Sequence, residues 1–345
     1  MRSEKFNRFL RFIKLKESNA ISKENGENFT VTPKNAFFEM IRMKKSHFKR
    51  DAQGFIFEGI TLAAVVIIIA ILVVMLVVII NGGKSMFTWE FLTSFPTEGM
   101  TKGGIFPAIF GTAMLVIIMS IAAVPFGTIT AIYLTEYAKE NSFIARSIRF
   151  AVRTLAVIPS IIYGLFGLGF FIKFVGTEMD NIFLGGQLKW GQPNIFWASL
   201  TMALLTLPVV IVSVEEALKT IPRELREASL ALGATKWQTI RKVVFPGSIS
   251  GIMTGTILAV SRGAGEVAPI LFTGAAYYLA TLPHSLSDQF MVLGYHIYIM
   301  STQSANVDQT LPIQFGTTLV LLILTFSLNF VAIILRYRIR KRRIA

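Results

Sequence analysis

A polar, basic stretch separates two long apolar segments of the chain. It reads EASLALG over residues 227–233 and, nine residues later, VVFP over residues 243–246. The apolar residues of its first part recur at the spacing of one helical face, and Pro222 suits the opening turn. Gly233 stands where helices commonly end in a left-handed residue. We therefore expect a short helix that stops at this glycine.

The residues after Gly233 predict a second helix. Residues 235–238 read TKWQ, a pattern in which Thr caps a helix and Gln three positions later returns the hydrogen bond. This helix would place Trp237, Ile240 and Val244 on one stripe. We expect two short helices joined by a glycine elbow and held outside a membrane, in a form that a partner protein can grip.

The composition is that of a polytopic membrane protein. Hydrophobic residues make up 53% of the chain and charged residues only 16%, against about 25% charged in soluble domains. There is no cysteine, so disulfides and thiolate chemistry are excluded. Three histidines lie far apart without the spacing of metal ligands, so we expect no metal site. The net charge of +14 is distributed as the orientation of a membrane protein requires, which argues against nucleic acid as a partner.

Six apolar segments predict an all-α integral membrane protein with six transmembrane helices. Lys and Arg concentrate in both tails, after the second segment and between about 215 and 246, whereas residues 277–314 contain neither. Both termini and the elbow are therefore expected in the cytoplasm. The chain divides into a basic tail at residues 1–57, a membrane domain at 58–337 and a basic tail at 338–345, with apolar segments at 59–80, 105–133, 150–174, 195–214, 249–276 and 315–336.

The fifth segment combines a stripe of small residues with two charges. The small residues recur every four positions, which lets another helix approach closely; they are Gly247, Gly251, Gly255, Ala259 and Gly263. Arg262 and Glu266 lie one helical turn apart inside the segment, where charge is costly. Either the two form an ion pair that only fixes helix packing, or Arg262 lines a pathway and attracts an anion while Glu266 orients it. Pro269 is expected to break the helix there.

Hydroxyl groups in the third segment are weaker candidates for the pathway. Ser160 and Tyr163 offer donors to an oxyanion, although helix packing is the simpler explanation of both. No catalytic residue is expected. Residues 81–85 end like a phosphate-binding loop, but Val78 occupies the position of the required glycine. The chain therefore carries no nucleotide site and no cofactor of its own, and any ATP is used by a partner.

Two motifs resemble a known family of membrane proteins. The pair Glu227-Ala228, then Gly233 and Pro246, is similar to the coupling loop of the permease subunits of bacterial ABC importers. Ser229 and Phe245 replace the usual Ala and Leu. The resemblance implies that Glu227, Ala228, Gly233, Trp237 and Pro246 dock into a separate ATPase subunit present as a dimer.

A second resemblance indicates the cargo. Residues 261–273, SRGAGEVAPILFT, resemble the A-type permease subunit of phosphate importers, and residues 158–167, IPSIIYGLFG, match the same family. The resemblance implies a second permease subunit, either a paralogue or another copy, an extracytoplasmic phosphate-binding protein and a place in the bacterial inner membrane. It also implies that Arg262 and Glu266 matter for the transport of inorganic phosphate.

The sequence thus predicts half of the membrane path of an ATP-driven phosphate importer, in contact with membrane lipid. The nearest alternative is a permease of the same class for sulfate, molybdate or another oxyanion. A secondary transporter or channel would leave the elbow unexplained, and a structural scaffold would not need Arg262 for uptake.

Overall fold

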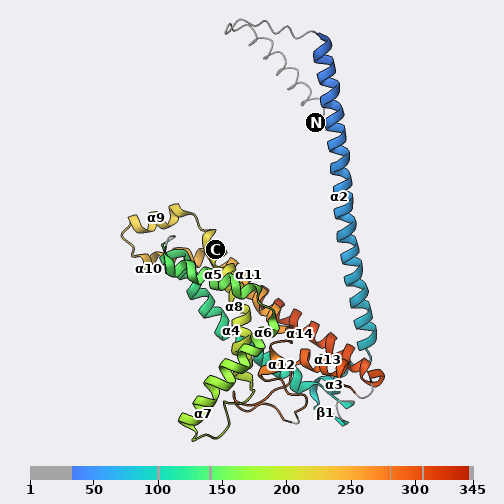
Figure 1. The fold of residues 1–345 in the computed structure, drawn as a ribbon, viewed down its shortest axis with the longest axis vertical. Coiled ribbons are helices and arrows are strands. Elements are labelled where there is room, and N and C mark those ends of the chain that lie inside the picture. Colours follow the sequence, from blue (N-terminus) through green and yellow to red (C-terminus); the bar gives the residue numbers. More distant parts are fainter. Residues whose placement is uncertain (1–32, 99–101, 140–141, 280, 305–306, 342–345) are drawn as a thin grey trace. The chain divides into compact units, whose positions relative to one another are not determined.

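The computed structural model describes residues 33–98, 102–139, 142–279, 281–304 and 307–341 (Figure 1). Most of the predicted N-terminal tail, up to residue 32, and the last four residues lie outside the described residues. By its internal contacts the chain divides into two units, Met1–Val73 and Val74–Ala345. Helix α2 (Pro33–Gly83) begins within the predicted N-terminal tail and continues through the first apolar segment.

Helices dominate the described part of the second unit, where the single sheet pairs β1 (Pro96–Thr97) with β2 (Lys102–Gly103) in antiparallel register. The elements around this hairpin are α3 (Trp89–Thr93), α4 (Phe106–Ile132) and the π-helical turn η2 (Tyr133–Tyr137). The elements that follow are α5 (Phe143–Val157), α6 (Ser160–Phe166), η3 (Gly167–Gly176), α7 (Thr177–Phe183), α8 (Ile195–Lys219), α9 (Arg223–Ala231), α10 (Lys236–Thr239), η4 (Ile240–Val244), α11 (Phe245–Ala264), α12 (Ile270–Thr273), α13 (Leu293–Thr302) and α14 (Val307–Lys341).

The predicted number of spans is confirmed within the described residues. Six helical runs are long and apolar enough to cross a membrane. They are Ile56–Gly83, Phe106–Tyr137, Ser160–Phe183, Ile195–Lys219, Lys236–Ala264 and Asp308–Arg338. The predicted bounds of the third and fifth segments are wrong, each for a local reason.

The third span begins ten residues later than predicted because the helix breaks at Ile158 and Pro159. Both residues have extended ψ angles, 131° and 137°. A residue before proline is sterically driven out of the α region. The Tyr163 hydroxyl crosses the break and donates to the carbonyl of Leu155 at 2.7 Å. The helix before the break, α5, is therefore separate from the span.

The fifth helix ends at Ala264, twelve residues before its predicted end, and the break comes before Pro269. Gly265 is its C-cap, and the peptide N–H groups of Gly265 and Glu266 donate to the carbonyls of Arg262 and Gly263. Residues 265–269 are not helical, and α12 supplies only one further turn. Glycine loses more backbone entropy in a helix than any other residue, so two glycines within three positions favour this end.

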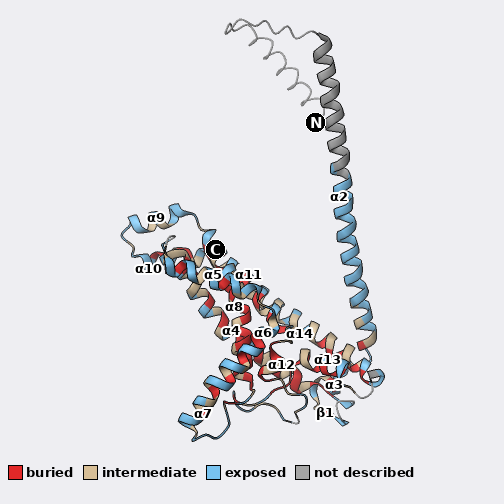
Figure 2. Cartoon of the chain, viewed as in Figure 1, coloured by how far each residue is buried: buried red, intermediate tan, exposed pale blue. Residues whose placement is uncertain are grey.

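The stripe of small residues on α11 packs against α8, as predicted. A Cβ added to Gly251 would lie 2.6 Å from the Ala217 Cβ, and one added to Gly247 would lie 2.7 Å from Ile221 Cδ1. A Cβ on Gly255 would overlap Ser213. Buried side chains of α4 and α8 continue the same core (Figure 2). The glycines therefore allow two helix backbones to approach closely.

The sequence did not predict a structured segment between the fifth and sixth spans, and the structure has helix α13 there. Helix α13 buries Leu293, Ile299 and Met300 in a cluster that includes Phe91 of α3. The peptide N–H of Leu293 donates to the Thr112 hydroxyl of α4 at 2.9 Å. This segment is therefore part of the folded bundle, although its ten-residue helix is too short to span a bilayer.

The close contact at Gly255 predicts a specific sensitivity. Gly255→Ala should destabilise the protein by about 1–3 kcal/mol, because the new methyl group overlaps Ser213 in a tightly packed core. Gly169→Ala is the matched control, since a Cβ there meets nothing within 4 Å. Thermal unfolding in detergent measures both variants. Equal melting temperatures would contradict the packing role of the stripe.

Candidate functional site

The predicted glycine elbow is confirmed by the backbone. Helix α9 ends at Ala231, and Gly233 has a φ of +84°. The N–H of Gly233 donates to the carbonyl of Leu230 at 2.9 Å, and that of Ala234 donates to Ser229 at 3.2 Å. These two bonds form the paired cap that glycine makes possible at a helix end. The elbow therefore has a defined geometry.

The second arm of the elbow is capped as predicted, but it is not a short helix. The Thr235 hydroxyl accepts the Gln238 N–H at 3.2 Å, and the Gln238 side chain accepts the Thr235 N–H at 2.8 Å. From Lys236 the chain runs without interruption through α10, η4 and α11 to Ala264. Pro246 sits just after the π-helical turn. The elbow is therefore connected directly to the fifth span.

Apolar side chains cover the elbow and have no core to pack into. Within α9, all of whose residues are described, none is buried (Figure 2). Leu232 is 89% exposed and Trp237 is 57% exposed, and Leu225 and Leu230 are also exposed. Glu227 and Ala228 are exposed as well. Large apolar side chains gathered on one small polar loop are typical of a surface that binds another protein.

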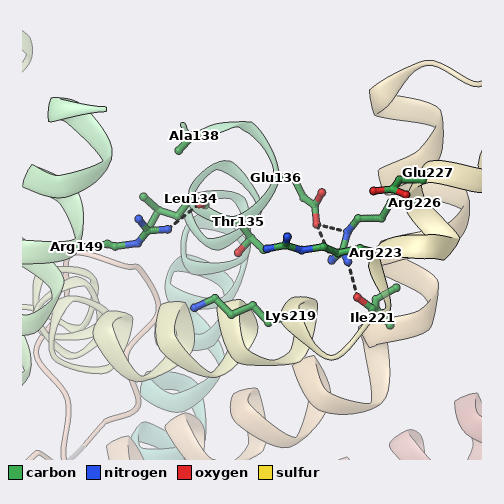
Figure 3. A pocket seen from close by; sticks show the side chains of 10 residues that line it. All are labelled: Leu134, Thr135, Glu136, Ala138, Arg149, Lys219, Ile221, Arg223, Arg226 and Glu227. Carbon is green, nitrogen blue, oxygen red and sulfur yellow. Dashed lines mark hydrogen bonds and ion pairs between the residues drawn. The ribbon is translucent and has the colours of Figure 1, made fainter. Parts of the chain in front are cut away.

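A cavity of about 520 Å³ lies at the base of the elbow (Figure 3). Its charged lining comes from η2, α5, α8 and α9, namely Glu136, Arg149, Lys219, Arg223, Arg226 and Glu227. Arg226 lies 3.0 Å from Glu136, and its Nη2 also donates to the carbonyl of Leu218 at 2.8 Å. Opposite charges therefore bring α9 to the ends of α4 and α8.

The second candidate region lies where α11 ends. Gly263 packs against Met119 and Thr206, which lie about half-way along α4 and α8. The end of α11 is therefore at the middle depth of the bundle. Here Nε of Arg262 lies 3.5 Å from Oε1 of Glu266, and the two side chains are 58% and 24% exposed.

The Arg262 guanidinium is only partly used by this pair. Within the described residues, its contact with Glu266 through Nε is the only interaction of the side chain. Among the described residues, the Nη groups make no hydrogen bond to a protein acceptor. A guanidinium in this state can bind an oxyanion through two parallel hydrogen bonds.

The third span lies beside this region, but the Tyr163 hydroxyl has a structural partner and does not face the proposed path. Tyr163 is buried, and its hydroxyl donates to the Leu155 carbonyl rather than into an open space. Ser160 is half-buried at the start of α6. A Cβ on Gly164 would lie 2.8 Å from the Pro269 carbonyl oxygen, so α6 packs directly on the segment after Glu266.

Two ionic contacts at the base of the elbow were not predicted from the sequence. One joins Arg226 to Glu136, and the other joins Arg149 of α5 to Glu215 of α8 at 3.3 Å. The sequence feature that could have indicated the first contact is Glu136, a carboxylate directly after the apolar segment at 105–133. Among the described residues, no group of three or more His, Asp or Glu side chains is placed to hold a metal ion.

Comparison with known proteins identifies the family. Residues 123–345 match the model of the family described as "Binding-protein-dependent transport system inner membrane component". The chain belongs to this family. Its elbow, spans and short segment after α11 are thus parts of an inner-membrane transport component that crosses the membrane several times.

Two curated relatives of this transport component are similar over most of their length. The probable ABC transporter permease protein YqgI of Bacillus subtilis is 31% identical over 258 residues, which cover 71% of this chain and 83% of that protein. The phosphate transport system permease protein PstA 1 of Mycobacterium tuberculosis is 34% identical over 247 residues, covering 70% and 73%.

Solved structures of other transporters show the same fold. A chain of a bacterial alginate ABC transporter, in complex with an alginate pentasaccharide-bound periplasmic protein, superposes with a TM-score of 0.59. The match covers 83% of this chain and 94% of that chain at 18% sequence identity. At this identity the likeness concerns the fold of the transport component alone.

The left-handed glycine predicts how the elbow tolerates substitution. Gly233→Ala should loosen the elbow by about 1–2 kcal/mol, because a Cβ strains a positive φ. Gly233→Asn is the matched control, since asparagine adopts this conformation more readily. The rate of trypsin cleavage after Lys236 measures the loosening. Equal rates in the two variants would show that the backbone of Gly233 is not a constraint.

Proposed function

We propose that this chain is the permease subunit of an ATP-driven phosphate importer and forms half of its translocation path. The observation that carries the proposal is Arg262, held at the middle depth of the bundle with unused donors. Relatives named as phosphate transport permeases support phosphate as the cargo. A paralogous permease or a second copy would supply the other half.

The elbow is the part that a partner ATPase would grip. Leu232 and Trp237 are exposed on it, and Glu227, Ala228, Gly233 and Pro246 complete the motif. ATP is bound and hydrolysed by a dimer of that partner, and this chain has no cofactor and no ATPase site of its own. Both termini and the elbow lie in the cytoplasm, and a phosphate-binding protein docks on the other side.

Transport of the anion depends on a balance between Arg262 and Glu266. Phosphate entering the path binds Arg262 in place of the Glu266 carboxylate or together with it. The anion accepts hydrogen bonds from the free Nη groups of Arg262. The carboxylate then competes with the anion for Arg262, so the site releases its cargo. Of the two predicted hydroxyls beside this segment, that of Ser160 contributes to the polar lining of the proposed path, because that of Tyr163 donates to the Leu155 carbonyl.

The alternative cargo is another oxyanion such as sulfate or molybdate, because a guanidinium binds each of them. A secondary transporter is a weaker alternative, since it gives no use to the exposed elbow. Competition by unlabelled anions separates the cargoes, and co-purification of an ATPase subunit separates the two transporter classes.

The proposed role of Arg262 can be tested by phosphate uptake. In cells lacking their own importer and supplied with the partner subunits, wild type should take up labelled phosphate, and Arg262→Gln should lower uptake about tenfold or more. Arg153→Gln in α5 is the control, because Arg153 is an exposed arginine that lines a cavity with Glu215 and Lys219 at the C-terminal end of α8. Membrane levels of all variants are compared on immunoblots.

Three outcomes of the uptake experiment would contradict different parts of the proposed function. Equal uptake by wild type and Arg262→Gln would make the ion pair structural. Uptake of sulfate or molybdate in place of phosphate would keep the permease and change its cargo. Uptake that continues without the ATPase subunit would contradict an ATP-driven mechanism.

The proposed docking of the ATPase subunit on the elbow can be tested by co-purification. Leu232→Asp should cost about 2 kcal/mol or more in binding of the ATPase subunit, because it places a charge in the centre of the proposed contact. Leu188→Asp is the control, since Leu188 is 69% exposed in the loop before α8, on the opposite side of the bundle. The measurement is the amount of ATPase subunit that co-purifies with each variant. Undiminished recovery with Leu232→Asp would place the docking surface elsewhere.

A further inference from the structure

Helix α9 has little packing of its own to hold it in place. It has nine residues, and none of them is buried. Isolated helices shorter than about 12 residues are marginal in water. The most enclosed charged side chain of this helix is Arg226, which is 19% exposed and turned into the protein.

Arg226 makes contacts with three parts of the chain at once. Its Nε and Nη2 lie 3.2 and 3.0 Å from Oε1 of Glu136. Its Nη2 donates to the Leu218 carbonyl at 2.8 Å, and its Nη1 donates to the Ile221 carbonyl. The two carbonyls belong to the last turn of α8 and the residues after it, where helical carbonyls lack a partner within the helix. Figure 3 shows the Arg226 side chain between Glu136 and Ile221.

Glu136 connects this arginine to the second span. It lies in η2, which continues α4 without interruption, and its side chain is only 8% exposed. A buried carboxylate requires a partner, and Arg226 is that partner. Upstream, α4 packs tightly on α8, since a Cβ on Gly127 would lie 2.6 Å from Val210 Cγ1. A displacement of α9 is therefore transmitted to the packed spans α4 and α8 together.

We propose that Arg226 is the positioning residue that transmits movement of α9 to the ends of α4 and α8. The inference rests on the proposed function, in which an ATPase moves the elbow. Arg226 fixes α9 to the spans rather than binding the ATPase, because its donors are engaged inside the protein. Without it, the elbow still carries Leu232 and Trp237 for docking but moves independently of α4.

The first test compares hydrolysis with transport in proteoliposomes of the full complex. With phosphate-loaded binding protein, Arg226→Met should keep ATP hydrolysis within about twofold of wild type while phosphate uptake falls about tenfold. Arg226→Lys keeps the charge beside Glu136 but loses the planar set of donors, so its uptake should be intermediate. Arg241→Met is the control, because it removes an exposed charge from η4.

Two results would overturn the proposal. Hydrolysis and uptake that fall by the same factor would show that the two are still coupled. Loss of the co-purified ATPase subunit would make Arg226 a docking residue. If Arg226→Met fails to accumulate, Glu136→Gln tests the same contact with a neutral side chain of equal shape, and it should also lower uptake more than hydrolysis.

The second test measures the connection itself and does not depend on the cargo. The chain has no cysteine, so single cysteines at Glu224 and Lys139, both exposed, can carry two spin labels. The distance between the labels should be the same in nucleotide-free and ATP-trapped wild-type complexes. In Arg226→Met it should broaden or shift on trapping. A wild-type distance that changes on trapping would overturn the rigid connection, whereas absence of phosphate uptake by wild type would contradict only the proposed function.

Discussion

Close contact between α8 and α11 is the constraint on which the rest of the structure depends. Glycines at four-residue intervals on α11 let its backbone lie against Ala217 and Ser213 of α8. In an apolar solvent there is no hydrophobic force between helices, so such close packing has to hold them together. The elbow connects these two helices, and its position is therefore set by their contact. Side chains larger than glycine would separate the helices and move the elbow.

The end of α11 inside the bundle is the second consequence of its glycines. Backbone that leaves a helix at membrane depth has to be buried in protein or line a cavity, because lipid offers no hydrogen-bond partner. Within residues 265–269, Pro269 is buried and packs against α6 at Gly164, and Val267 packs against Gly294 of α13. The same ending places Arg262 in the last turn of a helix, where a cation is favoured by the helix dipole. Chain geometry and charge therefore agree at the position proposed for the anion.

Local features of the sequence could be predicted, and distant contacts could not. The cap at Gly233 and the capping box at Thr235 and Gln238 depend on residues within a few positions of each other, so both were predicted correctly. The end of α11 was placed too late because residues 265–276, apart from Glu266 and Thr273, are glycine, proline or apolar residues, and hydropathy does not separate them from a span. The pairing of Arg226 with Glu136 joins residues 90 apart. Only the packing of α4 on α8 brings them together.

The elbow also determines an order of events during synthesis. Apart from the bonds of Arg226 to Glu136, the hydrogen bonds of the elbow join residues no more than ten apart, and the widest separation is between the hydroxyls of Ser229 and Thr239, which lie 2.9 Å from each other. Contacts so close in sequence require little loop closure and form fast. The α8–α11 contacts need the chain to return across the membrane first. The local bonds at Gly233 and Thr235 therefore form without the rest of the bundle, whereas α9 takes its final position only when α4 and α8 have packed and Glu136 meets Arg226.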